Sequence, residues 1–530
     1  MMQKLYFGGP ILTMEDAFPS AEAVLTEDGR ILAVGEREEL KLQAGPACQK
    51  IDLDGRTMLP AFLDPHSHFS GFANSFLQVP LDEVVSFEEI TEKIREFIEE
   101  NQIPEGQWVL AKGYDHNNLA EKRPPHKEVL DTAAPNHPLL LQHQSGHTGV
   151  FNSAALRLLG ITAQTPSPAG GKIEVKNGEL TGYVEENALI QYQDKIPMPS
   201  PKKLMGAYQK AQDKYMSYGI TTIQEGMMVK QLGPFYETLC RSHLLRLDVA
   251  GYLDIAESDS LIAEFPGHIR QYQDRFKIGG YKIFLDGSPQ SRTAWMLHPY
   301  QNAADGYCGY PTLTDEEIEF RIRKALTDNM QLLAHCNGDA ASLQYITTYD
   351  KVKKELLSSP DIRPVIIHAQ LLPEDQLDLA VKNRMIASFF AAHVYHWGDV
   401  HIENFGLERA KQISLAASAK KAGLPFTFHQ DSPVIQPDMM ETVWCAVNRI
   451  TKKGVLLGEE QKIPVWDALK AVTQQAAYQY FEEEEKGSIR PGKQANFAVL
   501  DRNPLAVEPM DLRNIRVLET IRQDETIFRR

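Results

Sequence analysis

Eight apolar segments, each followed by an amphipathic helical stretch, fill the middle of the chain. Strands that alternate with helices in this way predict βαβ units and a parallel sheet. Eight such units predict a closed (β/α)₈ TIM barrel. The segments are TMLPAFLDPH (57–66), GITTIQEG (219–226), LRLDVAGYL (245–253), GGYKIFLDGS (279–288), MQLLAHCNGD (330–339), RPVIIHAQ (363–370), MIASFFAAH (385–393) and PFTFHQD (425–431).

The two ends of the chain have a different pattern. Short β-type runs broken by Gly, Asp-Gly and Pro occupy 1–59, and a similar style returns in 486–530. Such runs with turn signals predict small antiparallel strands. We therefore expect one composite β-sandwich domain built from 1–59 and 486–530, a barrel over 60–485, and a subdomain inserted after the first barrel strand at about 80–215. The acidic run FEEEEKG (481–487) is expected to be a solvated helix end.

Composition excludes several classes of protein. The 530 residues carry a net charge of −16, which argues against nucleic acid or an anionic membrane as a partner. Neither a signal peptide nor an apolar run of membrane-spanning length is found in the sequence. The five cysteines show no CxxC spacing, so we expect a cytoplasmic protein without disulfides. A homodimer is compatible with the sequence.

Polar residues able to bind metal cluster at the carboxyl ends of the predicted strands, where barrel active sites are built. Residues far apart in sequence would therefore meet at one mouth. This convergence is far more specific than the HSH pair at 66–68 alone. The candidates are His66, His68, Lys282, His335, His368 and Asp431.

Imidazole nitrogens and a carboxylate suit zinc or a similar divalent ion. His66 and His68 would point to the same side of an extended strand, so both rings could reach one ion. Lys282 is the unusual member, because an ammonium would be repelled by a cation. It fits only as a neutral amine or as a carbamate formed with carbon dioxide. The alternative is a lysine paired with an acid such as Asp286.

The motifs DPHSH, YKIFLDGS, LLAHCNGD, VIIHAQ and FHQDSPV, taken in this order, resemble those of the amidohydrolase superfamily. More narrowly, the chain resembles the YtcJ-like metal-dependent hydrolases of amidohydrolase family 3, which include N-substituted formamide deformylases. The similarity extends to SGHTGVFNSAAL, DGSPQSRTAWMLHPY and the closing GSIRPGKQANFAVLDRNPL. It covers nearly the whole chain and does not identify the substrate.

The resemblance implies a set of ligands and roles. His66 and His68 would bind one ion with Asp431, and His335 and His368 would bind a second. Lys282 would bridge the ions as a carbamate, and zinc is the expected metal, with one or two ions per chain. A metal-bound hydroxide would attack an amide-type carbonyl. Asp431 would move the proton to the leaving amine, so that Asp431 and Lys282 are the expected catalytic residues.

Two segments depart from the family pattern, HQD at 429–431 and FFAAHVYHWGD at 389–399. Both lie near the expected mouth and concern the substrate more than the metal. Glu225 is a weaker candidate beside the mouth. Expected substrate contacts, each with packing or ion pairing as its alternative, are His147, Glu185, Arg292, Trp295 and His393.

Two other functions stay open at this point. One is a mononuclear deaminase or cyclic-amide hydrolase on the same scaffold, against which Lys282 argues. The other is a non-catalytic metal-binding regulator, which eroded ligands would indicate, and none of the ligands is eroded. Phosphate, dinucleotide and serine-nucleophile motifs are absent from the sequence.

Overall fold

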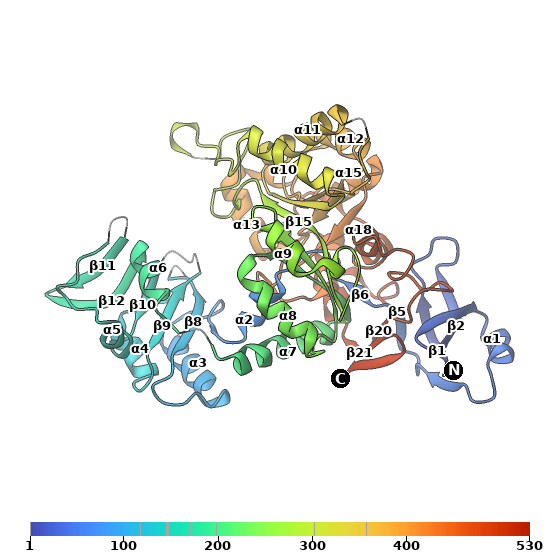
Figure 1. Cartoon of the computed structure of the whole chain (residues 1–530), viewed down its shortest axis with the longest axis horizontal. Coiled ribbons are helices and arrows are strands. Elements are labelled where there is room, and N and C mark those ends of the chain that lie inside the picture. Colours follow the sequence, from blue (N-terminus) through green and yellow to red (C-terminus); the bar gives the residue numbers. More distant parts are fainter. Residues whose placement is uncertain are drawn as a thin grey trace. The chain divides into compact units, whose positions relative to one another are not determined.

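The computed structural model describes residues 2–116, 118–144, 148–168, 171–197, 199–301, 303–356 and 358–530. The chain divides into two compact units. The first unit comprises Met1–Phe69 and Gln212–Arg530, and the second comprises Ser70–Ala211 (Figure 1). In the described residues, no helix is long and apolar enough to cross a bilayer.

An eight-stranded parallel sheet forms the centre of the first unit, in the order β19-β18-β17-β16-β15-β14-β13-β6. Each of the eight predicted segments contributes one strand. The strands are β6 (Phe62–Leu63), β13 (Ile220–Met228), β14 (Asp248–Asp254), β15 (Phe276–Phe284), β16 (Gln331–Cys336), β17 (Val365–His368), β18 (Ile386–Phe389) and β19 (Phe426–Phe428). Their burial on both faces explains the continuous apolar runs, which are typical of parallel sheets covered by helices.

The first and last strands of this order are linked just beyond their carboxyl ends. The amide of Asp431 donates to the carbonyl of His66 at 3.2 Å, and the amide of His68 donates to the carbonyl of Ser432 at 2.8 Å. These bonds bring the residues after β6 beside the residues after β19.

Helices follow the strands and bury their apolar faces. For example, α10 begins at a capping box in which Thr314 and Glu317 bond reciprocally, and it buries Ile318 and Ile322. The helices of this unit, including the short 3₁₀ turns, are α8 (Gly233–Arg241), α9 (Ser258–Glu264), α10 (Asp315–Thr327), α11 (Asp339–Glu355), α12 (Glu374–Lys382), α13 (His393–Phe405), α14 (Leu407–Ala410), α15 (Ala416–Ala422), α16 (Met439–Asn448), α17 (Val465–Ala471), α18 (Gln474–Gln479), η1 (Lys230–Leu232), η2 (Pro266–His268), η3 (Ala304–Gly306), η4 (Glu459–Gln461) and η5 (Pro509–Asn514).

Strands from both ends of the chain pair in a second eight-stranded sheet, with α1 (Arg37–Gln43) beside it. Figure 1 shows the red carboxyl-terminal strands beside the blue amino-terminal ones. Its path is β22-β21-β20-β5-β1-β2-β3, and β4 pairs with β1. The strands are β1 (Gln3–Leu12), β2 (Ser20–Glu27), β3 (Arg30–Gly35), β4 (Gln49–Asp52), β5 (Thr57–Pro60), β20 (Phe497–Leu500), β21 (Val517–Arg522) and β22 (Glu525–Arg529).

The first predicted barrel strand, 57–66, is divided between these two sheets. β5 pairs with β1 and β20, whereas β6 pairs with β13. Pro60 ends the first of these strands. A single apolar run therefore serves two sheets, which its hydrophobicity alone does not reveal.

The second unit contains a six-stranded sheet in the order β11-β12-β10-β9-β8-β7, in which β7, β8 and β9 are parallel. Its apolar core includes Ile90, Ile94 and Leu130 of the helices. The elements are α2 (Phe69–Ser75), which begins in the first unit, β7 (Val79–Pro80), α3 (Phe87–Glu100), β8 (Val109–Tyr114), α4 (Lys127–Ala133), β9 (Leu139–His143), β10 (Thr148–Phe151), α5 (Ser153–Leu159), β11 (Gly171–Lys176), β12 (Glu179–Glu186), α6 (Asn187–Gln193) and α7 (Pro201–Ser217), which ends in the first unit.

The expected solvated acidic end at 481–487 is wrong for Glu482. This residue is buried and pairs with Lys277 and with Lys486, the latter at 2.8 Å. Lys486 also bonds Asp248 at 2.6 Å, and Asp248 accepts from Arg522 at 2.5 Å. The two lysines explain why a carboxylate at this position enters the interior, since buried charges are found paired.

Candidate metal centre

The six predicted ligands meet at the carboxyl edge of the parallel sheet. Lys282 lies within β15 and His335 within β16, and His368 is the last residue of β17. His66 and His68 follow β6, and Asp431 follows β19. The carboxyl ends of parallel strands share one edge, so the fold itself places these residues together.

The carboxylate of Asp431 is the point of convergence. Its Oδ1 lies 3.5 Å from Nε2 of His66 and 3.5 Å from Nε2 of His68, and its Oδ2 lies 3.8 Å from Nε2 of His368. Oδ1 is buried and makes no hydrogen bond within the described residues. A buried carboxylate oxygen normally accepts hydrogen bonds. Ligand atoms that approach one another without bonding are what a bound cation requires.

Lys282 reaches the same point from β15. Its Nζ lies 3.1 Å from Nε2 of His66, and its side chain is fully buried. No described carboxylate comes within ion-pair distance of it. The alternative partner Asp286 instead accepts from the backbone amides of Asn337 at 3.0 Å and Gly338 at 2.7 Å. Lys282 thus points toward the imidazoles rather than toward a structural acid.

His335 and His368 form a second pair of donors. Nδ1 of His335 lies 3.1 Å from Nε2 of His368. On its far side, Nε2 of His335 lies 3.1 Å from the carbonyl of Gly287 and 3.0 Å from Nδ2 of Asn337. Nδ1 of His335 and Nε2 of His368 therefore face each other at the mouth.

The backbone at two of these positions is strained. His368 has φ 70° and Asp431 has φ 55°, both in the left-handed region. Residues other than glycine occupy that region at a cost, and such residues concentrate at functional sites. This backbone conformation changes the direction of each side chain at the position where its strand ends.

A layer of buried partners orients the histidines. Nδ1 of His66 bonds Oε1 of Gln224 at 2.6 Å. Nδ1 of His368 lies 3.1 Å from Nε2 of His429, whose Nδ1 lies 2.9 Å from Oγ of Ser388. Second-layer bonds of this kind fix ring orientation and tautomer in metal sites. In the sequence, His429 stood out only as a departure from the family pattern, although its place directly after the last strand, two residues before Asp431, indicates an inward side chain.

Burial sets the charge of these groups. It lowers the pKa of His68 and of His335 to about 3, and it lowers the pKa of His66 and His368 in the same direction. The rings are therefore neutral at pH 7, the form that binds metals. Burial also lowers the pKa of Lys282 to about 7, against the attraction of Asp431.

The carboxyl of Asp431 shifts in the opposite direction. Burial raises its pKa to about 7, against the attraction of Lys282. Near neutral pH this group can both accept and release a proton. A bound cation would favour its charged form.

The expected substrate contacts on the first unit lie in two places. His393 begins α13, is buried, and stacks on Phe390 with ring centroids 4.1 Å apart, and its own centroid lies 6.1 Å from that of His368. Arg292 and Trp295 lie in the segment after β15. Nε of Arg292 donates to Oδ1 of Asn404 at 2.8 Å, so this guanidinium is engaged within the protein.

The remaining candidates are Glu185, His147 and Glu225. Glu185 lies in β12 of the second unit and pairs with Lys172 at 3.7 Å. His147 lies outside the described residues. Glu225 is buried in β13 of the first unit, and its Oε2 accepts from the hydroxyl of Tyr236 at 2.8 Å.

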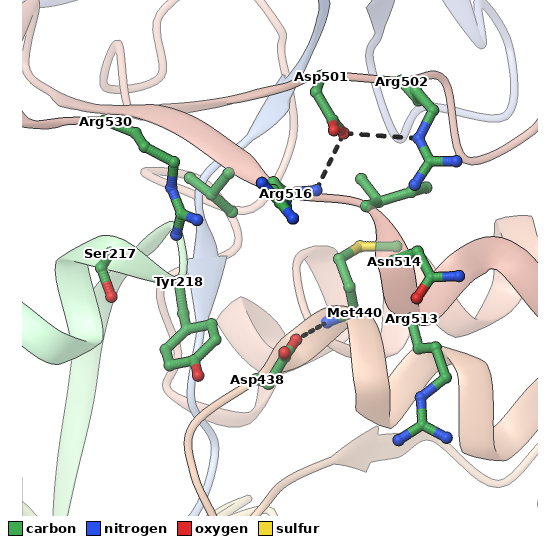
Figure 2. Close-up of a pocket in the computed structure, with 12 residues that line it drawn as sticks. Ser217, Tyr218, Asp438, Met440, Asp501, Arg502, Arg513, Asn514, Arg516 and Arg530 are labelled. Atoms are coloured by element: carbon green, nitrogen blue, oxygen red, sulfur yellow. Dashed lines mark hydrogen bonds and ion pairs between the residues drawn. The ribbon is translucent and has the colours of Figure 1, made fainter.

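A cavity of about 590 Å³ in the first unit contains none of the predicted site residues. Figure 2 shows arginines around it, from the segments before β21 and from Arg530. Two of them have ion pairs, since Arg513 pairs with Glu441 at 3.1 Å and Arg502 with Asp501 at 3.9 Å. Asp438 caps α16 by accepting from two backbone amides. The lining of this cavity is polar, and none of the candidate metal ligands belongs to it.

The sequence pattern of the amidohydrolase family matches residues 49–528. The chain is 28% identical to the protein YtcJ of Bacillus subtilis (strain 168), over 99% of each chain. It is 27% identical to the N-substituted formamide deformylase of Arthrobacter pascens, over 98% of this chain and 97% of that one. The structure of an uncharacterized metal-dependent hydrolase from Pyrococcus furiosus superposes with a TM-score of 0.78 and 24% identity, covering 95% of this chain and all of the other.

Proposed function

This chain belongs to the amidohydrolase family, and from that premise we propose that it hydrolyses a carbon–nitrogen bond outside peptides, in a small N-substituted amide or formamide. Membership implies a hydrolase that uses a divalent metal and has a TIM-barrel-type α/β fold. The observation that carries the proposal is the convergence of three imidazole nitrogens on the carboxylate of Asp431.

The side chains present fit such a metal. Neutral imidazoles and a carboxylate are the donors that zinc prefers, and Oδ1 of Asp431 is buried without a hydrogen-bond donor among the described residues. His66, His68 and Asp431 would hold one ion, and His335 with His368 a second. Lys282, carbamylated, would lie between them. When bound, the metal supplies Lewis acidity and lowers the pKa of a water molecule.

The protein's own groups would handle the proton. Asp431 accepts it from the attacking water on a carboxylate oxygen and delivers it to the nitrogen of the departing amine, so that water and amide become acid and amine. The partners of His66 and His368 keep both rings in place while this happens. Burial excludes bulk water from the reacting groups.

The aromatic side chains beside His368 favour an apolar N-substituent. Phe390 stacks on His393, and Trp397 lies edge-on to both rings at 5.8 and 5.3 Å between centroids. Tyr300, an aromatic residue in the segment after β15, is instead buried in the core against Phe405. The similarity to a formamide deformylase agrees with this direction.

Closure of the sheet underlies the site. We infer that the strands form a complete (β/α)₈ barrel, with the composite sheet of both chain ends and the insertion as separate domains. The hydrogen bonds between the residues after β6 and those after β19 support closure. Without it, His66 and His68 would not reach Asp431.

A substrate panel tests the proposal. Protein purified without chelator, in bicarbonate buffer, would be assayed for release of amine and formate from N-benzyl and N-alkyl formamides, with dipeptides and aminopurines as competitors. We expect hydrolysis of the formamides and about two ions per chain by elemental analysis. Turnover of dipeptides alone would contradict the bond class, and deamination with about one ion would favour the mononuclear alternative.

A further inference from the structure

A second group of metal-ligating side chains lies in the second unit. Asp115, His116 and His143 each offer one ligand atom within 4.8 Å of the others. Nε2 of His143 lies 3.2 Å from Nδ1 of His116 and 3.5 Å from Oδ1 of Asp115. The remaining side of this triangle, from His116 to Asp115, is 4.0 Å.

The strands of the second unit explain the convergence. β8 and β9 are parallel neighbours, and Tyr114 at the end of β8 is in register with His143 at the end of β9. Asp115 and His116 follow β8 directly. The amide of Gln144 donates to the carbonyl of Tyr114 at 2.8 Å, which continues the pairing beyond the strands. Two parallel strand ends therefore present their side chains at one edge, as the parallel sheet of the first unit does.

We propose that Asp115, His116 and His143 bind a divalent transition-metal ion of the zinc, cobalt or nickel kind. This site is additional to the metal centre of the first unit and does not depend on the proposed hydrolysis. Three protein ligands leave one position of a tetrahedral ion for water.

The distances fit such an ion. Ligands about 2.1 Å from zinc in tetrahedral geometry lie about 3.4 Å from one another. The measured sides of 3.2, 3.5 and 4.0 Å bracket that separation. Small side-chain rotations would bring all three atoms to coordination distance.

Each ring nitrogen of a neutral histidine has either a proton or a lone pair, and a nitrogen with a lone pair can bind a metal ion. A cation at the centre attracts all three lone pairs at once. Two of the three donors are imidazole nitrogens, which excludes magnesium and calcium as preferred ions, since both favour oxygen.

The side chains are open to solvent. They are exposed by 24% at Asp115, 36% at His116 and 14% at His143, so an ion can enter and water can complete its shell. We expect this site to exchange its ion readily.

Calorimetric titration of the full chain with Zn²⁺ at pH 7, with excess Mg²⁺ present, tests the inference. The metal-stripped wild type is compared with His143→Gln and His116→Gln. We expect about one ion per chain fewer in each variant. Because His116 is the most exposed of the three ligands, His116→Gln keeps the test valid if His143→Gln fails to fold, which circular dichroism would reveal.

The matched control is His126→Gln in the same unit. His126 is 30% exposed and lies 3.8 Å from Glu174, and among the described residues it belongs to no group of three close metal-ligating atoms. This variant should keep the wild-type stoichiometry. Equal stoichiometry in the wild type, His143→Gln and His116→Gln would overturn the proposal, and so would a wild-type step abolished by Mg²⁺.

Discussion

Both units gather imidazoles and a carboxylate at the ends of parallel strands, but they build the two groups differently. In the first unit the donors come from five strands far apart in sequence, and the side chains of His66, His368 and Asp431 are exposed by only 1%, 4% and 13%. In the second unit two neighbouring strands supply all three candidate ligands, and their side chains are partly exposed, by 24% at Asp115, 36% at His116 and 14% at His143. The same edge geometry thus yields an enclosed centre from five strands and a more open group from two neighbouring strands.

The enclosed centre also has the buried partners described above, from Gln224 to Ser388. Burial of this kind holds neutral imidazoles ready and keeps water away from a reacting group. An open triangle can capture an ion yet leaves its shell in exchange with solvent. The difference predicts reactivity in the first unit and reversible binding in the second.

Asp431→Asn gives the largest expected effect. Turnover should fall about 10²–10⁴-fold because the amide cannot accept the proton, while the fold is kept. Measured kcat on the best formamide checks this. Asp378→Asn, on the exposed face of α12, is the control and should match the wild type. Full activity in Asp431→Asn would show that Asp431 does not transfer the proton.

Lys282→Ala should lose turnover together with bound metal in the first unit. Elemental analysis and kcat are measured in parallel, with Lys421→Ala on α15 as the exposed control. Partial recovery with added acetate or propionate would support the carbamate, since a carboxylate offers the same two oxygens. Unchanged metal content would show that Lys282 is not a ligand.

His429→Asn should weaken zinc binding in the first unit by about 10–100-fold, because His368 loses its buried partner. The zinc step assigned to the second unit should not move. Competition with a chromophoric chelator measures both affinities in one experiment. Equal weakening of the two steps would point to a global loss of structure instead.

His401→Gln gives the smallest effect and separates burial from ligation. His401 is buried on α13 outside both groups, and burial lowers its pKa to about 3 from 6.5. Between pH 6.5 and pH 3 the unfolded chain therefore binds a proton at His401 that the folded chain does not bind. The contribution of His401 to the free energy of unfolding is fully present above pH 6.5 and decreases as the pH falls toward 3. On acidification over this range, the free energy of unfolding should fall less in the variant than in the wild type, by up to about 1.4 kcal/mol per pH unit. Urea unfolding of the variant and of the wild type at pH 7 and pH 5 measures it.

Much of the first unit could be predicted from its sequence. Parallel strands buried on both faces leave long apolar runs, and a polar residue at the end of each run marks the mouth. The candidate ligands His335 and His368 follow directly from that rule. The split of 57–66 into β5 and β6 could not be predicted, because burial in either sheet demands the same apolar residues.

The group in the second unit escaped prediction for a different reason. WVLAKGYDH and LLLQH each end an apolar run in metal ligands, but without the parallel pairing of β8 and β9 nothing connects them. The orienting role of His429 likewise depends on its contact with Ser388, forty-one positions earlier in the chain. The local sequence pattern locates the ends of strands, whereas the pairing of strands in the sheet determines which of these ends lie close together.

The pairing of β20 with β5 has a consequence for biosynthesis. β5 ends at Pro60 and its partner begins at Phe497. At ribosomal rates of about 5–20 residues per second, roughly 20–90 s separate their emergence. Throughout that interval the nascent chain carries an unpaired strand edge, the kind of surface that recruits chaperones or other chains. The sheet built from both ends of the chain therefore remains prone to aggregation until β20 has been synthesised and has paired with β5.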